Sequence, residues 1–227
     1  MERSLGRSER ILRVTASPRH RGQPQKTLAS SGARGLASCA MTTIQILLLG
    51  GASGTGKTTV GWELSAILEQ RCVAHCVIDG DTLGHIFPAP PGDPSRSRIV
   101  ERNLASVWSG FAEVGQTRLI YTNTVSVLEE EMIRRAVRAS SAGGVVSSEV
   151  EVEVEFTSVV LVAGARTVAQ RLARRETGDR VDLHIDRSLR AAMLLLQQRA
   201  SESVVVISTD GRAVEDVALE VLDATGW

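Results

Sequence analysis

The chain has 227 residues, of which 26 are basic, 26 are acidic and 43% are hydrophobic. This length suits one domain with a core of ordinary size, and no apolar run approaches the roughly 18 residues that a membrane-spanning helix requires. Phe, Tyr and Trp make up only 3% of the residues, and the net charge is zero. We therefore expect neither a membrane protein nor a nucleic-acid-binding protein with a basic surface.

The first forty residues differ in composition from the remainder. Residues 1–40 contain seven Arg and one Lys against two Glu, whereas residues 41–227 contain 18 basic and 24 acidic side chains. The segment is rich in Arg, Ser and Gly and lacks apolar periodicity, which predicts a disordered extension before a domain at 41–227. Three interpretations remain open: a non-native extension before a start at Met41, a basic tail for anionic partners, or an Arg-rich targeting peptide.

Apolar runs and helical patterns alternate along the predicted domain. We expect strands at 44–50, 73–81, 117–124, 150–164 and 203–209. Helical spacing predicts helices at 57–70, 95–114, 125–139, 165–178, 182–198 and 213–224. The segment 85–95 holds four of the six prolines and is expected to be a loop. Because strands and helices alternate, the strands should pair in parallel, giving an α/β three-layer sandwich around a five-stranded parallel sheet.

The three cysteines are Cys39, Cys72 and Cys76. An odd number of cysteines without a secretory signal indicates a reducing compartment, so we expect a cytoplasmic protein. Cys72, His75 and Cys76 lie close together in the sequence, but a zinc site needs about four ligands and no second Cys/His pair is present.

The stretch GASGTGKT at Gly51–Thr58 fits the pattern G-x-x-x-x-G-K-[ST] between a predicted strand and a predicted helix. Glycines let successive backbone N–H groups point at an anion, and the helix N-terminus adds further free N–H groups. Lys57, one of two lysines among 24 arginines, should reach the β- and γ-phosphates of ATP, and Thr58 offers a hydroxyl to Mg²⁺. The predicted nucleotide-binding residues are Gly51, Ser53, Gly54, Thr55, Gly56, Lys57, Thr58 and Thr59.

The acidic residues nearest this motif follow the second predicted strand, at Asp79-Gly80-Asp81, whereas the third strand ends in YTNT without Asp or Glu. With GASGTGKTT and DGD together, the sequence resembles small-molecule kinases of the nucleoside-monophosphate-kinase-like group, and most of all adenylylsulfate kinase and gluconate kinase. The resemblance covers residues 44–224. It implies the P-loop NTPase fold, with ATP and Mg²⁺ used to phosphorylate a hydroxyl of a small-molecule acceptor.

The resemblance also implies roles for other residues. Asp79 or Asp81 is implied as the base that accepts the hydroxyl proton, and the choice between them stays open. A helical lid at about 165–190 is implied, with Arg171 and Arg175, which are four residues apart on one helix face, closing over the phosphates.

The acceptor is expected to bind between the second and third strands, at about 82–115. Arg98, Arg102 and Asn103 are the candidate acceptor-binding residues, although the two arginines also fit a solvated helix face. Adenylylsulfate kinases carry DREENIR near this position, whereas this chain has SRIVERN, so the identity of the acceptor stays open. An alternative function is a nucleotide-binding regulatory module that transfers no phosphate to a small molecule.

Overall fold

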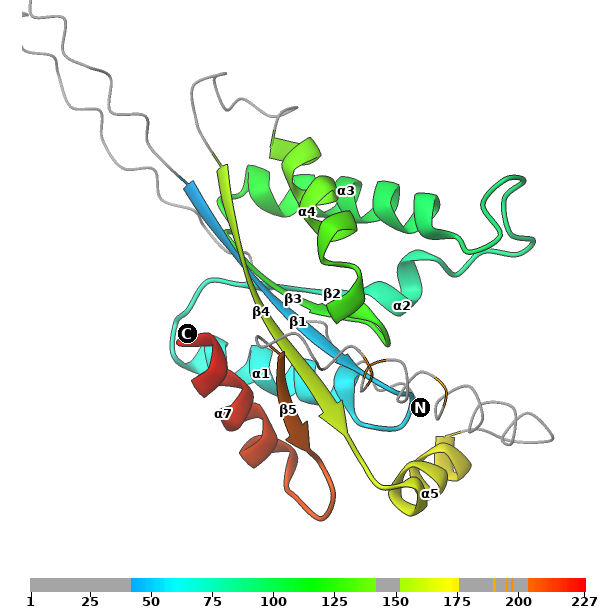
Figure 1. The fold of residues 1–227 in the computed structure, drawn as a ribbon. Coiled ribbons are helices and arrows are strands. Elements are labelled where there is room, and N and C mark those ends of the chain that lie inside the picture. Colours follow the sequence, from blue (N-terminus) through cyan, green and yellow to red (C-terminus); the bar gives the residue numbers. More distant parts are fainter. Residues whose placement is uncertain (1–41, 142–151, 176–189, 191–194, 196, 198–203) are drawn as a thin grey trace, which may run out of the picture. The chain divides into compact units, whose positions relative to one another are not determined.

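The computed structural model describes residues 42–141, 152–175, 190, 195, 197 and 204–227 (Figure 1). Its five strands are β1 (Thr42–Gly51), β2 (Cys76–Asp79), β3 (Arg118–Thr122), β4 (Val152–Val162) and β5 (Val204–Ser208). The strands form one sheet in the order β2-β3-β1-β4-β5, and all four pairings are parallel. This arrangement confirms the predicted five-stranded parallel sheet.

Helices cover both faces of the sheet, α3 and α4 on one side and α1 and α7 on the other (Figure 1). The helical segments are α1 (Lys57–Gln70), α2 (Gly80–Leu83), α3 (Ser97–Glu113), the 3₁₀ helix η1 (Ser126–Leu128), α4 (Glu130–Ser141), α5 (Ala165–Arg175) and α7 (Val214–Thr225). No helix in the described residues is long and apolar enough to cross a membrane.

The two core layers follow from the alternation of side chains along the central strand β1. Leu47 and Leu49 pack with residues of α1 and α7, whereas Ile46 and Leu48 pack with residues of α3 and α4. A strand segment buried on both faces must be apolar at every position, which explains the continuous apolar run Ile46–Leu49. The three-layer sandwich is therefore confirmed.

Some element boundaries differ from the sequence predictions. The second strand covers Cys76–Asp79 rather than 73–81, because the Asp79 side chain accepts a hydrogen bond from the Asp81 N–H and so starts the short helix α2. The predicted helix at 125–139 is divided into η1 and α4. The extension at 1–40, most of the predicted helix at 182–198 and the lid beyond Arg175 lie outside the described residues.

Candidate functional site

The phosphate-binding loop, Gly51–Thr58, connects the end of β1 to the start of α1. Gly54 and Gly56 have φ angles of 84° and 100°, in the left-handed region that favours glycine. Gly56 is the N-cap residue of α1 and makes no side-chain capping hydrogen bond. The backbone N–H groups of the loop and of the first helical turn are therefore suited to hold an anion such as a nucleotide phosphate.

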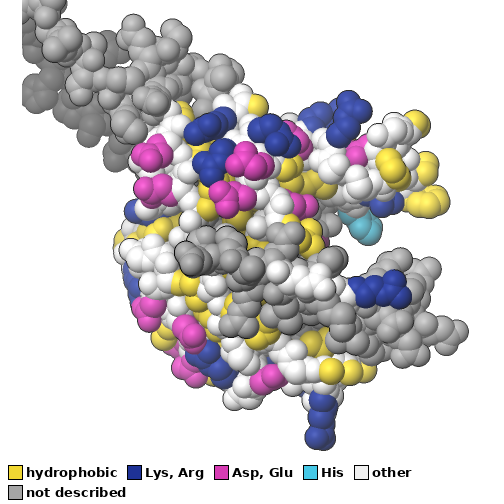
Figure 2. Space-filling model, in the orientation of Figure 1, with side chains coloured by type: hydrophobic (Ala, Val, Ile, Leu, Met, Phe, Trp, Pro, Cys, Tyr) yellow, Lys and Arg dark blue, Asp and Glu magenta, His cyan; other side chains and the backbone are white. Residues whose placement is uncertain are grey.

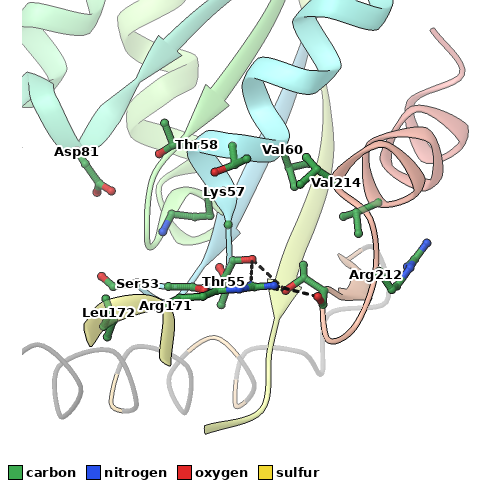
Figure 3. A pocket seen from close by; sticks show the side chains of 15 residues that line it. Ser53, Thr55, Lys57, Thr58, Val60, Asp81, Arg171, Leu172, Arg212 and Val214 are labelled. Carbon is green, nitrogen blue, oxygen red and sulfur yellow. Dashed lines mark hydrogen bonds between the residues drawn. The ribbon is translucent and has the colours of Figure 1, made fainter. Parts of the chain in front are cut away.

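A cavity of about 370 Å³ opens above this loop (Figure 3). One end is lined by loop and α1 residues that were predicted to bind nucleotide: Ser53, Gly54, Thr55, Gly56, Lys57, Thr58 and Thr59. The remaining lining comes from α1, α2, α5, α7 and the turn between β5 and α7: Val60, Asp81, Arg171, Leu172, Thr209, Arg212, Val214 and Val217. Gly51, the remaining predicted nucleotide-binding residue, does not line the cavity and ends β1 instead. The cavity thus combines a polar phosphate cradle with a more apolar extension.

Lys57 lies at the polar end of the cavity and is only 6% exposed. Its Nζ donates a hydrogen bond to the carbonyl oxygen of Ala52, 3.4 Å away. Figure 3 shows the side chain extending toward the part of the cavity where Asp81 projects. A compact ammonium group therefore lies close to where the loop N–H groups converge.

Asp79 and Thr58 form the part of the site that fits a magnesium ion. The Thr58 hydroxyl donates to Oδ2 of Asp79 over 3.5 Å, while Oδ1 of Asp79 accepts the Asp81 N–H over 3.0 Å. A hydroxyl and a carboxylate are hard oxygen ligands, and Mg²⁺ is commonly held by one or two such groups together with phosphates and water. No group of three or more His, Cys, Asp or Glu in the described part of the chain is arranged to hold a metal ion alone.

Asp81 differs from Asp79 in its surroundings. It is exposed and lines the cavity, whereas Asp79 does not. Its Oδ1 accepts a hydrogen bond from the Thr124 N–H at 3.5 Å. The sequence left these two acids equivalent, and the structure separates a carboxylate bound to Thr58 from a carboxylate that faces the cavity.

The residue between the two acids, Gly80, has to be a glycine for a steric reason. A Cβ atom at this position would overlap the hydroxyl of Tyr121 and lie 2.5 Å from its ring carbon Cζ. Tyr121 is completely buried in β3. A residue without a side chain is therefore required between Asp79 and Asp81.

A third acid, Glu129, lies near the DGD turn and was missed by the sequence analysis. Its Oε2 accepts a hydrogen bond from Nδ2 of Asn123 over 2.8 Å, at the end of β3. Burial raises the pKa of Glu129, and the charge of Asp81 raises it further, although the hydrogen bond from Asn123 opposes this shift. No strand-end pattern marks Glu129, because η1 separates it from β3 by several residues.

Arg171, predicted to close over the phosphates, is bound to carbonyl groups of the phosphate-binding loop. Its Nη1 donates to the carbonyl oxygens of Gly54 and Thr55 over 3.1 and 3.2 Å, and also contacts Thr209. Arg175 ends α5, and its side chain lies outside the described residues. The turn after β5 contributes side chains that were not predicted, because a Thr-Asp-Gly sequence resembles any ordinary turn.

The candidate acceptor-binding residues do not line the cavity above the loop. Arg98 and Arg102 line a second cavity of about 720 Å³ between the proline-rich segment, α3 and α4. Nδ2 of Asn103 donates to the carbonyl oxygen of Leu83 over 2.8 Å and thus connects α3 to the end of α2. The two cavities share no lining residue.

The second cavity carries charges of both signs. Arg135 and Glu101 form a two-point ion pair there, with nitrogen–oxygen distances of 3.0 and 2.9 Å. Acidic and basic side chains are likewise interspersed over the α3 and α4 side of the molecule (Figure 2). The sequence reading of Arg98 and Arg102 as a solvated helix face therefore agrees with their exposure.

Comparisons with known proteins identify the family to which this chain belongs. A model of the adenylylsulphate kinase family matches residues 43–160, more than half of the chain. No curated protein sequence matches the chain. Among solved structures, a gluconokinase from Sinorhizobium meliloti is 20% identical, with a TM-score of 0.47 over 80% of this chain and 91% of that one.

Two further solved structures are similar. The APS kinase of Mycobacterium tuberculosis, solved with AMPPNP and APS, is 15% identical, with a TM-score of 0.46 over 82% of this chain and 99% of that one. A tunicamycin resistance protein from Deinococcus radiodurans is 19% identical, with a TM-score of 0.48 over 81% of this chain and 96% of that one.

The family match begins in β1 and ends in β4, so it includes both the phosphate-binding loop and the DGD turn. These are the two motifs on which the sequence resemblance to small-molecule kinases rests. The protein is a P-loop kinase of small molecules, and this chain belongs to the adenylylsulphate kinase family.

Proposed function

We propose that this kinase transfers the γ-phosphoryl group of ATP to a hydroxyl of a small molecule, with Asp81 as the general base. The observation that carries the proposal is that Asp81 and the phosphate-binding loop line the same cavity. Phosphoryl transfer depends on positioning and charge stabilisation, which requires the acceptor group and the phosphate to meet in one place.

Different groups of the chain would bind different parts of MgATP. The N–H groups of the loop and of α1 hold the phosphates, and Lys57 adds a positive charge at the same end. The nucleoside would extend toward Val214 and Val217 of α7, where apolar side chains are available for its base. Mg²⁺, when bound, neutralises phosphate charge, and Thr58 and Asp79 would hold it, directly or through water.

Asp81 is the better candidate base of the two acids, because it faces the cavity while both carboxylate oxygens of Asp79 accept hydrogen bonds. A base must come within hydrogen-bond reach of the hydroxyl whose proton it accepts. The family name and the sequence resemblance make adenylylsulfate and gluconate the first acceptors to test.

The nucleotide site is tested by the variant Lys57→Ala. Binding of MgATP at a hundredfold excess over its Kd stabilises a protein by about 2.7 kcal/mol, which corresponds to a rise in Tm of roughly 5–10 °C for a domain of this size. We expect Lys57→Ala to lose most of this shift while its nucleotide-free Tm stays close to that of the wild type. A shift as large as the wild type's would refute the assignment of the loop.

The acceptor is tested by incubating the wild-type protein and MgATP with a panel of hydroxyl-bearing metabolites. Release of ADP and the mass of a phosphorylated product are measured together. A kinase yields one acceptor that accelerates ADP release and gains a phosphoryl group. Release of ADP without a phosphorylated product under every condition would favour the regulatory module instead.

A further inference from the structure

The carbonyl groups of the phosphate-binding loop pose a structural problem. When successive N–H groups turn toward an anion, the neighbouring carbonyl oxygens turn away from it and need donors of their own. Ala52 meets this need within the loop, since its carbonyl oxygen accepts from the Thr55 hydroxyl over 2.9 Å and from Lys57 over 3.4 Å. The carbonyls of Gly54 and Thr55 are instead bound by groups from the C-terminal part of the chain.

Arg171 on α5 connects these two carbonyls to the turn after β5 (Figure 3). Its Nη1 donates to Gly54 and Thr55, and also to the Thr209 hydroxyl at 2.9 Å. Its Nη2 donates to the Thr209 carbonyl oxygen at 3.1 Å. The planar guanidinium therefore spans from the loop to the turn, which a lysine ammonium with a single nitrogen cannot do.

The Thr209 side chain completes the connection and is only 4% exposed. Its hydroxyl accepts from Arg171 and lies 3.0 Å from the carbonyl oxygen of Thr55, to which it donates. The loop carbonyl is thus bound by two donors, from α5 and from the turn after β5.

Helix α5 is itself held in place against the loop. The position of a Cβ on Gly54 would be 3.3 Å from the side chains of Val168 and Leu172, so the loop packs directly on the helix. At the start of α5, the Gly164 N–H donates to Oδ2 of Asp210 over 2.7 Å. Arg171 therefore projects from a helix that is fixed both to the loop and to the β5 turn.

From these contacts we propose that Arg171 and Thr209 are positioning residues that hold the phosphate-binding loop in its phosphate-binding conformation. This inference rests on the proposed function of the loop and changes the role predicted for Arg171, which was to close over the phosphates during transfer. The N–H groups of the loop would contact the phosphates of ATP and ADP alike. Loss of either side chain should therefore weaken the binding of both nucleotides by the same factor. Side chains that stabilise the bound nucleotide equally in the ground state and in the transition state affect Kd, so their loss leaves kcat at saturating ATP almost unchanged.

The test compares Thr209→Val, which removes the hydroxyl at similar volume, with Thr209→Ser, which retains it. We expect Thr209→Val to raise the Kd for MgATP and for MgADP roughly tenfold each, as for the loss of a buried hydrogen bond. Thr209→Ser should bind both nucleotides as the wild type does. Arg171→Lys keeps the charge but cannot connect the loop to the turn, so its Kd values should resemble those of Thr209→Val. Arg166→Ala, at an exposed position on the same helix, serves as a control.

A second measurement needs no nucleotide. Hydrogen exchange of the backbone amides at 52–58 in the free protein should be faster in Thr209→Val and Arg171→Lys than in the wild type and in Thr209→Ser. Unchanged exchange in both variants would overturn the proposal, as would a loss of kcat with unchanged MgADP affinity, because that result indicates a group acting on the transferred phosphoryl. Failure of the wild type to bind nucleotide would refute the proposed function, while the exchange result would still decide the role of Arg171 and Thr209.

Discussion

Single residues at the centre of the site show how closely the side-chain type is determined by its surroundings. Lys57 is one of only two lysines in a chain with 24 arginines, and it is almost fully buried beside the loop backbone. A compact ammonium on a thin stem fits there, whereas the broad guanidinium of Arg171 is half-buried and donates to the loop carbonyl oxygens of Gly54 and Thr55. The two cations bind different carbonyl oxygens of the same loop and are not interchangeable.

The variant Asp81→Asn tests the base. We expect kcat to fall by roughly 10²- to 10⁴-fold, the usual contribution of a general base, with the Kd for MgATP unchanged. Asp79→Asn is the contrasting variant, because asparagine still caps α2 but removes the negative charge beside Thr58. It should raise the Mg²⁺ concentration needed for half-maximal rate, and equal kinetic effects of both variants would contradict the separate roles.

Gly80→Ala tests the steric requirement in the DGD turn. The new methyl group would overlap the buried Tyr121 side chain, so we expect a loss of roughly 1–3 kcal/mol in the free energy of unfolding. The matched control is Gly110→Ala in α3, where nothing lies within 4 Å of the new Cβ. That variant should gain roughly 0.4–1 kcal/mol from helix propensity. Denaturant unfolding of both proteins measures the difference, and equal effects would refute the steric explanation.

At the scale of elements, the segment from η1 to the start of α4 places an acidic side chain near the end of β3, which has no Asp or Glu of its own. Asn123 follows β3 directly, and its side-chain amide binds Glu129, which precedes α4. A helix predicted over 125–139 would have placed Glu129 within a continuous helix, whereas the division into η1 and α4 places it near Asp81. Glu129 therefore lies near the carboxyl ends of the strands because the helical segment is interrupted between η1 and α4.

The raised pKa of Glu129 predicts a pH dependence of stability. Between the ordinary glutamate pKa and the higher folded value, the folded protein binds more protons than the unfolded chain, so stability falls as the pH rises through this window. Glu129→Gln removes the buried charge but keeps an acceptor for Asn123. We expect its Tm to exceed that of the wild type at pH 7, and the difference to disappear toward about pH 4.

Thermal unfolding across this pH range measures the effect. The control is Glu113→Gln, which makes the same substitution at an exposed side chain near the end of α3. A Glu129→Gln protein that is less stable than the wild type at neutral pH would show that the carboxylate is stabilising.

At the scale of the whole described structure, the order of the sheet brings distant parts of the chain together. β1 is central, with β3 and β4 as its neighbours, so the loops after β1, β2 and β5 emerge at one edge of the sheet (Figure 1). Gly54, Asp81, Arg171 and Thr209 meet around one cavity as a result, although they span 155 residues of sequence separation between first and last. All four of these residues lie after position 41.

Deletion of residues 1–40 tests this division of the chain. Within the described residues, the core layers and the cavity are built from 42–227, so we expect an unchanged Tm and an unchanged Kd for MgATP in the shortened protein. Calorimetry of both forms provides the measurement. A large fall in Tm would show that the extension stabilises the domain.

Local patterns in the sequence determined the strands, most helices, the parallel sheet and the phosphate-binding loop. These features depend on residues that are close in sequence, namely apolar runs, helical spacing and the glycines before Lys57. Only the tertiary structure decided how Asp79 differs from Asp81, why Gly80 must be a glycine, and where Arg171, Asn103 and Glu129 form their hydrogen bonds. Those outcomes depend on partners 6 to 117 residues away along the chain, and the folded sheet alone brings such partners within hydrogen-bond distance.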